Sequence, residues 1–184
     1  MDALAADRNV AAQCLRFIVL TGCRLGEALK ATWGEVDLES AEWMIPGSRM
    51  KGRREHRIPL SPQVMELLRS LYTEEDNAYL FVSNRTARTH VAEATVTVAL
   101  RKAGCTATIH GFRSCLKTWA EEQTNFPGLV VELSLAHKVG TAVEQVYRRG
   151  DVIVKRRNLM EAWAQFCTTP PVEQKTGKVV TLHA

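Results

Sequence analysis

The sequence has little that would suit a secreted or membrane-spanning protein. Its five cysteines include no CxxC pair, whereas a secreted disulfide framework usually has an even number at compact spacing. The longest apolar stretches, such as residues 17–20, fall far short of the roughly 20 residues that span a bilayer. The chain also begins without the basic-then-apolar order of a signal peptide. We therefore expect a cytoplasmic protein with reduced thiols, in which Cys14, Cys23 and Cys115 belong to the core.

A large excess of one charge and the common cofactor motifs are also missing. Lys and Arg together number 24 against 20 for Asp and Glu, a net charge of only +4. There is no P-loop GxxxxGK[ST] to cradle phosphates. The acidic residues form no DxD-like set for divalent ions, and no His and Cys pair has zinc-site spacing. We therefore expect no metal and no cofactor, which disfavours a metal-dependent nuclease.

What is present is an ordinary globular composition, with 46% hydrophobic and 24% charged residues among 184. Apolar residues at helical spacing predict a helix over 8–20 and a second one with Thr21 as its N-cap. Alternating polarity over 35–60, punctuated by Gly and Pro, predicts a small antiparallel sheet. A serine followed by proline at 61–62 predicts the start of another helix.

The second half of the chain is predicted to be largely helical. A short strand is expected at 78–83 and a helix at 89–103, although a β-branched run there also permits a strand. Four more helices are expected near residues 110–124, 129–136, 140–149 and 152–167. The fold class is therefore mostly α with a small antiparallel β-sheet (α+β). This domain covers residues 1–168, and a C-terminal tail over 169–184 is either flexible or ordered by a partner.

Positive charge is concentrated in two segments. The first, over 48–57, contains Arg49, Lys51, Arg53, Arg54 and Arg57. The second contains Arg148, Arg149, Lys155, Arg156 and Arg157. Either group alone is typical of a solvated surface, but two in one small domain favour contacts with a nucleic-acid backbone.

Two short motifs place an arginine beside a second ionisable group. His110 and Arg113 lie three residues apart, so they share a helix face, and together they suit a phosphoryl oxygen. Arg24 is followed three positions later by Glu27 in TGCRLGEAL. Each motif alone is weak, because HxxR is usually a surface pair. The second is explained equally well by a helix ion pair of roughly a few tenths of a kcal/mol.

In combination, these motifs resemble the tyrosine recombinase, or phage integrase, family. The family signature is an arginine in TGxRxGE, a hairpin lysine, HxxR, an LGH-like histidine and a nucleophilic tyrosine. The matching residues, in the same order, are Arg24, Lys51, His110, Arg113, His137 and Tyr147. The resemblance covers roughly residues 8–167 and is greatest to prophage and genomic-island integrases. Leu25 and Ala136 are mild departures from the pattern.

The resemblance implies the tyrosine recombinase catalytic-domain fold, a phosphate-binding role for three residues and a supporting role for a fourth. Arg24 and Arg113 would clamp the scissile phosphate, with Glu27 orienting Arg24. His137 would hydrogen-bond the phosphate and help to hold it. Further DNA-backbone contacts are expected from Arg49, Arg53, Arg54, Arg148 and Arg149.

The resemblance also implies the chemistry of strand cleavage. Tyr147 would attack the phosphate to leave a 3′-phosphotyrosyl bond, Lys51 would protonate the departing 5′ oxygen, and His110 would assist proton transfer. A tyrosine with its pKa near 10 needs roughly 4 kcal/mol to be ionised at neutral pH. Cations around the phosphate can lower that cost. The covalent bond conserves the phosphodiester energy, so neither ATP nor a redox cofactor is required.

The prediction from the resemblance is an enzyme, a site-specific DNA recombinase acting in DNA integration in the bacterial cytoplasm. Its partners would be double-stranded attachment sites and other recombinase subunits in a tetrameric synapse, without any membrane. The N-terminal DNA-clamping domain usual in such proteins is expected to be missing before residue 1. Two alternatives stay open, a catalytically silent DNA-binding relic and a type IB topoisomerase-like relaxation of DNA.

Two further histidines and the tryptophans have no assigned role. His56 and His90 are expected at the surface. The four tryptophans are expected in the core or at its edge, because tryptophan buries a large apolar area.

Overall fold

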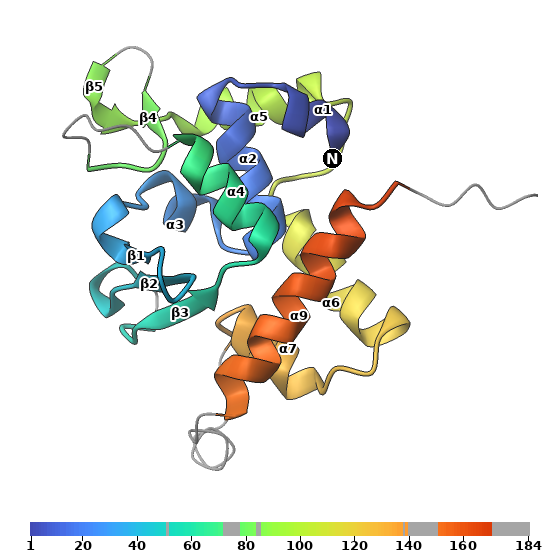
Figure 1. The fold of residues 1–184 in the computed structure, drawn as a ribbon. Helices are drawn as coiled ribbons and strands as arrows, with labels where there is room; N and C mark the ends of the chain where they lie inside the picture. Colours follow the sequence, from blue (N-terminus) through green and yellow to red (C-terminus); the bar gives the residue numbers. More distant parts are fainter. Residues whose placement is uncertain (51, 72–77, 84–85, 138, 140–150, 171–184) are drawn as a thin grey trace, which may run out of the picture.

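The computed structural model describes residues 1–50, 52–71, 78–83, 86–137, 139 and 151–170 (Figure 1). Lys51 and the whole of 140–150 lie outside the described residues. That segment includes the helix expected over 140–149 and three predicted site residues, Tyr147, Arg148 and Arg149.

Helix α2 (Val10–Thr21) is the central helix and packs against α1 (Asp2–Ala6) and α3 (Leu25–Leu29). The side chain of Asn9 accepts a hydrogen bond from the Ala11 amide and caps its start. The helix predicted over 8–20 is therefore confirmed. The expected N-cap role of Thr21 is wrong, because this residue ends α2 and its hydroxyl donates to the Phe17 carbonyl at 2.7 Å. Helix α1 has no counterpart in the sequence prediction.

The predicted small sheet is confirmed as three antiparallel strands, β1 (Val36–Asp37), β2 (Glu42–Ile45) and β3 (His56–Pro59), in the order β1-β2-β3. Short 3-10 helices η1 (Trp33–Glu35) and η2 (Gly47–Arg49) precede β1 and follow β2. Trp43 pairs with Ile58 across the sheet and points inward, where its ring lies 5.1 Å from that of Phe17. The sheet is therefore anchored on α2.

Helix α4 (Pro62–Leu71) begins where the serine-proline pair predicts, and the Ser61 hydroxyl accepts from the Val64 amide at 3.4 Å. A second, two-stranded sheet is formed by β4 (Val82–Ser83) and β5 (Thr86–His90). The helix predicted over 89–103 exists as α5 (Glu93–Lys102), so its first residues belong to a strand instead. Gly104, with φ +77°, follows its C-terminus.

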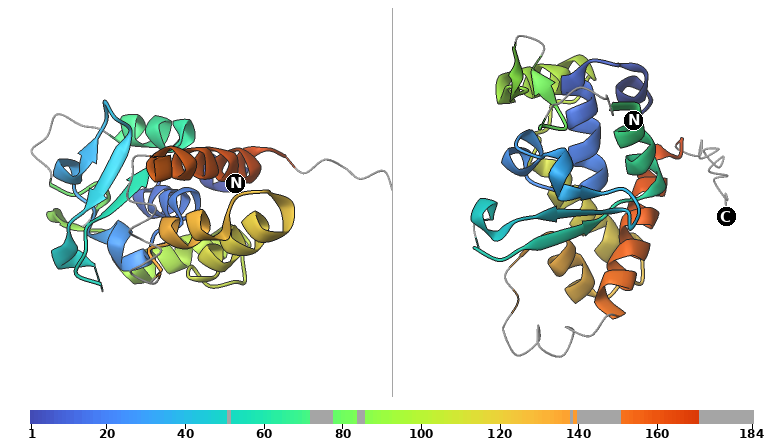
Figure 2. Two further views of the ribbon diagram at one scale, coloured as in Figure 1. Left: turned by 90° about the horizontal axis from the view of Figure 1, so that it is seen from below. Right: turned by 60° about the vertical axis from the view of Figure 1, so that its left-hand side comes forward.

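Helices α6 (Gly111–Gln123), α7 (Gly128–Ser134) and α9 (Asp151–Thr168) match three of the predicted C-terminal helices. They enclose a second, smaller core built around Leu116, Trp119 and Trp163. Figures 1 and 2 show α9 running lengthwise past α6 and α7, and it contacts both of these helices as well as α2. The Trp163 indole donates to the Val19 carbonyl at 2.7 Å and joins the smaller core to α2.

The fold class is thus mostly α with small antiparallel sheets, as predicted. The tryptophans lie in the core or at its edge, as expected, because Trp43, Trp119 and Trp163 are buried and Trp33 packs partly buried against the core. Cys14 and Cys23 are buried, but the assignment of Cys115 to the core is wrong, since its side chain is exposed on α6. None of the helices among the described residues combines the length and apolar character needed to cross a membrane.

Candidate functional site

The turn between α2 and α3 positions Arg24. Gly22 ends α2 in the left-handed conformation at φ +62°, where a Cβ atom would lie 2.9 Å from the Leu116 Cδ1 atom. Arg24 then forms the N-cap of α3, and its amide donates to Glu27 Oε2 at 2.8 Å. The Arg24 guanidinium donates to the other carboxylate oxygen, also at 2.8 Å. Glu27 thus fixes the position of Arg24, whose side chain remains 33% exposed.

Arg113 is buried in the first turn of α6 and is held by two backbone carbonyls. It donates from Nη1 to Gly22 and from Nη2 to Leu135, the latter at 2.5 Å. These carbonyls are the C-caps of α2 and α7, where helices present unpaired acceptors and negative charge. Burial lowers the pKa of Arg113, as does the charge of Arg24, while Glu27 raises it. Arg24 and Arg113 carry two positive charges, and within the described part of the chain Glu27 is the one carboxylate that acts on Arg113. The remaining positive charge favours a bound anion.

His137 is placed by the C-terminal turn of α7. Its amide donates to the Glu132 carbonyl at 3.0 Å, and the Ala136 amide donates to Leu133 at 3.2 Å. This is the Schellman pattern, in which the residue after the C-cap adopts a left-handed conformation, and Ala136 does so at φ +50°. The turn brings the His137 Nε2 atom to 3.4 Å from the Arg113 Nη2 atom.

Three of the predicted catalytic residues line one hollow of about 320 Å³, namely Arg24, His110 and Arg113. The hollow is completed by residues of α5 and of the 105–109 segment. His110 is the exposed N-cap of α6, one turn before Arg113. The structure therefore brings together these three side chains, and His137 joins them through Arg113. Lys51 and Tyr147 lie outside the described residues.

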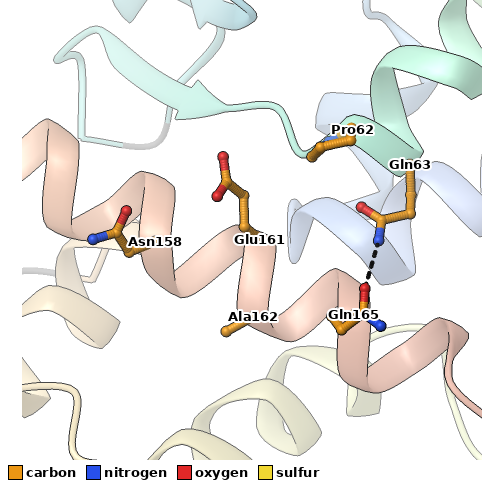
Figure 3. Close-up of a pocket in the computed structure, with 6 residues that line it drawn as sticks. All are labelled: Pro62, Gln63, Asn158, Glu161, Ala162 and Gln165. Carbon is orange, nitrogen blue, oxygen red and sulfur yellow. Dashed lines mark hydrogen bonds between the residues drawn. The ribbon is translucent and has the colours of Figure 1, made fainter.

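A second hollow, of about 410 Å³, lies between the start of α4 and α9 (Figure 3). Gln63 donates across it to Gln165 at 3.5 Å, and its lining also includes Asn158 and Glu161. It contains none of the predicted catalytic residues and a single ionisable group, so we place the candidate site in the smaller hollow.

The cations of 48–57 differ in their surroundings. Arg49 is half-buried, and its guanidinium pairs with Glu35 and donates to the Glu27 carbonyl at 2.5 Å. We therefore leave Arg49 out of the proposed DNA contacts. Arg53, at φ +53°, and Arg54 are both exposed in the turn before β3.

The cations at the start of α9 do not all face solvent, contrary to the prediction for the second basic segment. Arg156 is buried and donates to the Arg57 carbonyl. Arg157 donates to the Ser40 carbonyl at 3.1 Å and to Glu42 at 3.2 Å. Both arginines therefore attach α9 to the three-stranded sheet.

The expectation that His56 lies at the surface is wrong, whereas His90 keeps part of its side chain exposed. His56 is the buried first residue of β3, and His90 is half-buried with its ring 5.5 Å from that of Tyr79. Burial, with the charge of Arg156 second, lowers the pKa of His56 to about 3, although a hydrogen bond with the Ser134 backbone raises it. The alternation of inward His56 and Ile58 along β3 is the sequence signal that could have predicted this burial.

Glu132 and Lys117 were not predicted from the sequence, yet Glu132 contacts His137 directly and Lys117 contacts the other oxygen of the Glu132 carboxylate. Glu132 Oε2 lies 2.5 Å from the His137 Nδ1 atom, and Lys117 Nζ lies 2.5 Å from Glu132 Oε1. A glutamate five residues before a histidine, at the end of a helix, is the signal that was available.

The sequence model of the phage integrase family matches residues 1–152. The chain belongs to this family. The chain is 32% identical over 184 residues to the prophage integrase IntA of Escherichia coli strain K12, across 97% of this chain and 43% of IntA. It is 31% identical over 161 residues to the integrase of Shigella phage Sf6, across 85% of this chain and 41% of that protein. The chain therefore spans less than half the length of the curated relatives it matches.

Solved structures of phage integrases share the fold. The integrase of mycobacterium phage Brujita superposes with a TM-score of 0.70 at 20% identity, over 94% of this chain and 58% of that one. A lambda integrase dimer bound to a core site superposes with a TM-score of 0.54 at 20% identity, over 80% of this chain and 56% of that one. The tyrosine recombinase catalytic-domain fold predicted from the sequence is therefore confirmed.

Proposed function

We propose that this chain is the catalytic part of a site-specific recombinase that cleaves and rejoins DNA in integration. The observation that supports this most is the convergence of Arg24, Arg113 and His137 in a member of the phage integrase family. Attachment-site DNA and further recombinase subunits in a tetramer are the partners that this activity requires.

In the proposed reaction, Arg24 and Arg113 bind the non-bridging oxygens of the scissile phosphate. Arg113 keeps further N–H donors beyond the two used on carbonyls, so a phosphate can bind without displacing its anchors. Because these donors are held in place beforehand, they can stabilise the charge that develops in the transition state. Tyr147 attacks the phosphorus, Lys51 protonates the leaving 5′ oxygen, and His110 assists proton transfer.

The test is covalent capture of DNA by Tyr147. The substrate is a library of duplexes, randomised around one 5′-bridging phosphorothiolate, whose 5′-thiol leaving group cannot readily be rejoined. We expect a protein–DNA adduct that survives denaturant and is absent with Tyr147→Phe. Sequencing the captured DNA would also identify a preferred site.

A chain that binds the library but forms no adduct would contradict the proposal and support the DNA-binding relic. Arg24→Gln and Arg113→Gln are expected to reduce adduct formation by about 10³-fold each, since a preorganised donor to a developing charge contributes about that much. Arg8→Gln removes one exposed cation at the start of α2 and should leave the rate unchanged.

A further inference from the structure

The end of α7 places an acid directly beneath a predicted phosphate-binding histidine. In a Schellman turn the third residue from the helix end and the second residue beyond it usually make an apolar contact. Here those positions are held by Glu132 and His137, and their contact is a hydrogen bond of 2.5 Å between Oε2 and Nδ1. The backbone turn that positions His137 therefore also places the Glu132 carboxylate against its ring.

The carboxylate of Glu132 is held in its ionised form. Lys117, on α6, donates from Nζ to Oε1 at 2.5 Å. This hydrogen bond is the largest cause that lowers the pKa of Glu132, and the hydrogen bond with His137 also lowers it, while partial burial raises it. An ionised carboxylate only accepts hydrogen bonds. The Nδ1 atom of His137 must therefore carry the proton in this contact.

The opposite ring nitrogen of His137 is the one directed at the site. Its Nε2 atom lies 3.4 Å from the Arg113 Nη2 atom. With Nδ1 fixed on Glu132, the ring cannot turn over without losing that hydrogen bond, even though its side chain is 38% exposed. The phosphate would thus always meet Nε2. A phosphate oxygen only accepts hydrogen bonds, so Nε2 must also carry a proton when it binds the phosphate, and the Glu132 carboxylate would then balance the charge of the imidazolium.

We propose that Glu132 is a positioning residue for strand cleavage, which sets the orientation and tautomer of His137, with Lys117 holding Glu132 in turn. This inference rests on the proposed function, because His137 acts only if the site binds a phosphate. It assigns a role to a contact between α6 and α7 that would otherwise simply join two helices.

Glu132→Gln separates positioning from simple helix attachment. The glutamine has the same size, and Lys117, which can only donate, will occupy its amide oxygen. The amide NH2 group then faces His137 and requires an unprotonated Nδ1 atom. The variant should therefore fold with the tie to Lys117 intact but switch the neutral His137 ring to the Nε2–H tautomer.

The first measurement is the nitrogen-15 NMR spectrum of His137 in the free chain, read at the neutral end of a pH titration. We expect protonated Nδ1 in the wild type and protonated Nε2 in Glu132→Gln. Glu121→Gln is the matched control. Glu121 also pairs with Lys117, at 3.7 Å, whereas the carboxylate that pairs with His137 is that of Glu132. An unchanged tautomer in Glu132→Gln would overturn the proposal.

The second measurement is the rate of adduct formation on the duplex captured by the wild-type chain. We expect Glu132→Gln to be slower by about 10- to 100-fold, the range seen when a metal-binding histidine loses its outer carboxylate partner, with DNA affinity and melting temperature unchanged. A switched tautomer with an unchanged rate would also refute the positioning role. Absence of any wild-type adduct would instead contradict the proposed function, and the NMR result would still decide whether Glu132 sets the tautomer.

Discussion

Ala136 occupies a backbone conformation that favours glycine. It lies just before His137 with φ +50°, at the position where the family pattern has glycine and this chain has alanine. A left-handed conformation costs a residue with a Cβ atom roughly 1–2 kcal/mol. The substitution that looks mild in the sequence therefore carries strain in the turn that supports the site.

Replacing this alanine is expected to stabilise the chain. Ala136→Gly should raise the free energy of unfolding by about 1 kcal/mol, because glycine adopts positive φ without strain. Urea denaturation measures the change. Ala94→Gly, at an exposed position within α5, makes the same replacement in ordinary helical backbone and should lower stability by about the same amount. If both substitutions changed the free energy of unfolding in the same direction, the prediction would be contradicted.

His56 gives the chain a pH-dependent stability. Its pKa is lowered to about 3 in the fold, from an ordinary value of 6.5. Between these values the unfolded chain binds more protons, so stability falls as pH decreases below about 6.5 and is fully present above it. From this residue alone, the free energy of unfolding should be about 1 kcal/mol lower at pH 5.5 than at pH 7.5.

The measurement is urea denaturation at both pH values for the wild type and His56→Gln. Glutamine keeps a hydrogen-bonding group near Ser134 but does not titrate in this range. The variant should therefore lose about 1 kcal/mol of the pH dependence. An identical pH dependence in both proteins would show that His56 is not buried in its neutral form.

At the scale of elements, the site is built from helix ends. The carbonyls that end α2 and α7 both bind Arg113, and the turn between α2 and α3 presents Arg24. Gly22 is the residue on which these contacts depend, because it combines a φ of +62° with close packing against Leu116.

Gly22→Ala is expected to destabilise the chain by about 1–2 kcal/mol through the left-handed backbone alone. Contact with Leu116 should add to this loss, since the new Cβ atom would lie 2.9 Å from the Cδ1 atom. Gly128→Ala, at the start of α7, places a Cβ atom in open space and should be neutral or slightly stabilising. Thermal melting of the two variants gives the comparison, and equal melting temperatures would refute the prediction.

At the scale of the whole molecule, the net charge of +4 says little about where DNA would bind. Arg156 and Arg157 attach α9 to the sheet, and Arg49 pairs with Glu35. Arg53 and Arg54 are the exposed cations of the turn before β3. Charge clustering in a sequence therefore overstates the basic surface, because arginine also serves to join elements inside a fold.

Arg53 is expected to contact a DNA phosphate. Arg53→Asn removes the charge and keeps a residue that tolerates the positive φ of this position. The slope of log K against log salt for a generic duplex should become shallower by about 0.9, the contribution of one phosphate contact. Arg8→Asn, which removes an exposed cation near α1, should leave the slope unchanged. Equal slopes for wild type and Arg53→Asn would contradict the contact.

The sequence by itself determined most of the helical elements, the three-stranded sheet and the family, because local periodicity and spaced motifs are properties of the chain. It also determined that Arg24 and Glu27 would lie close together, since they are three residues apart. Only the tertiary structure decided which cations are buried, that His56 is enclosed, and that Arg113 binds the ends of α2 and α7. The Arg113 contacts join residues up to 91 positions apart, and such pairings depend on how the helices pack together. The same packing places Lys117 against Glu132 and makes a helix-end glutamate part of the candidate site.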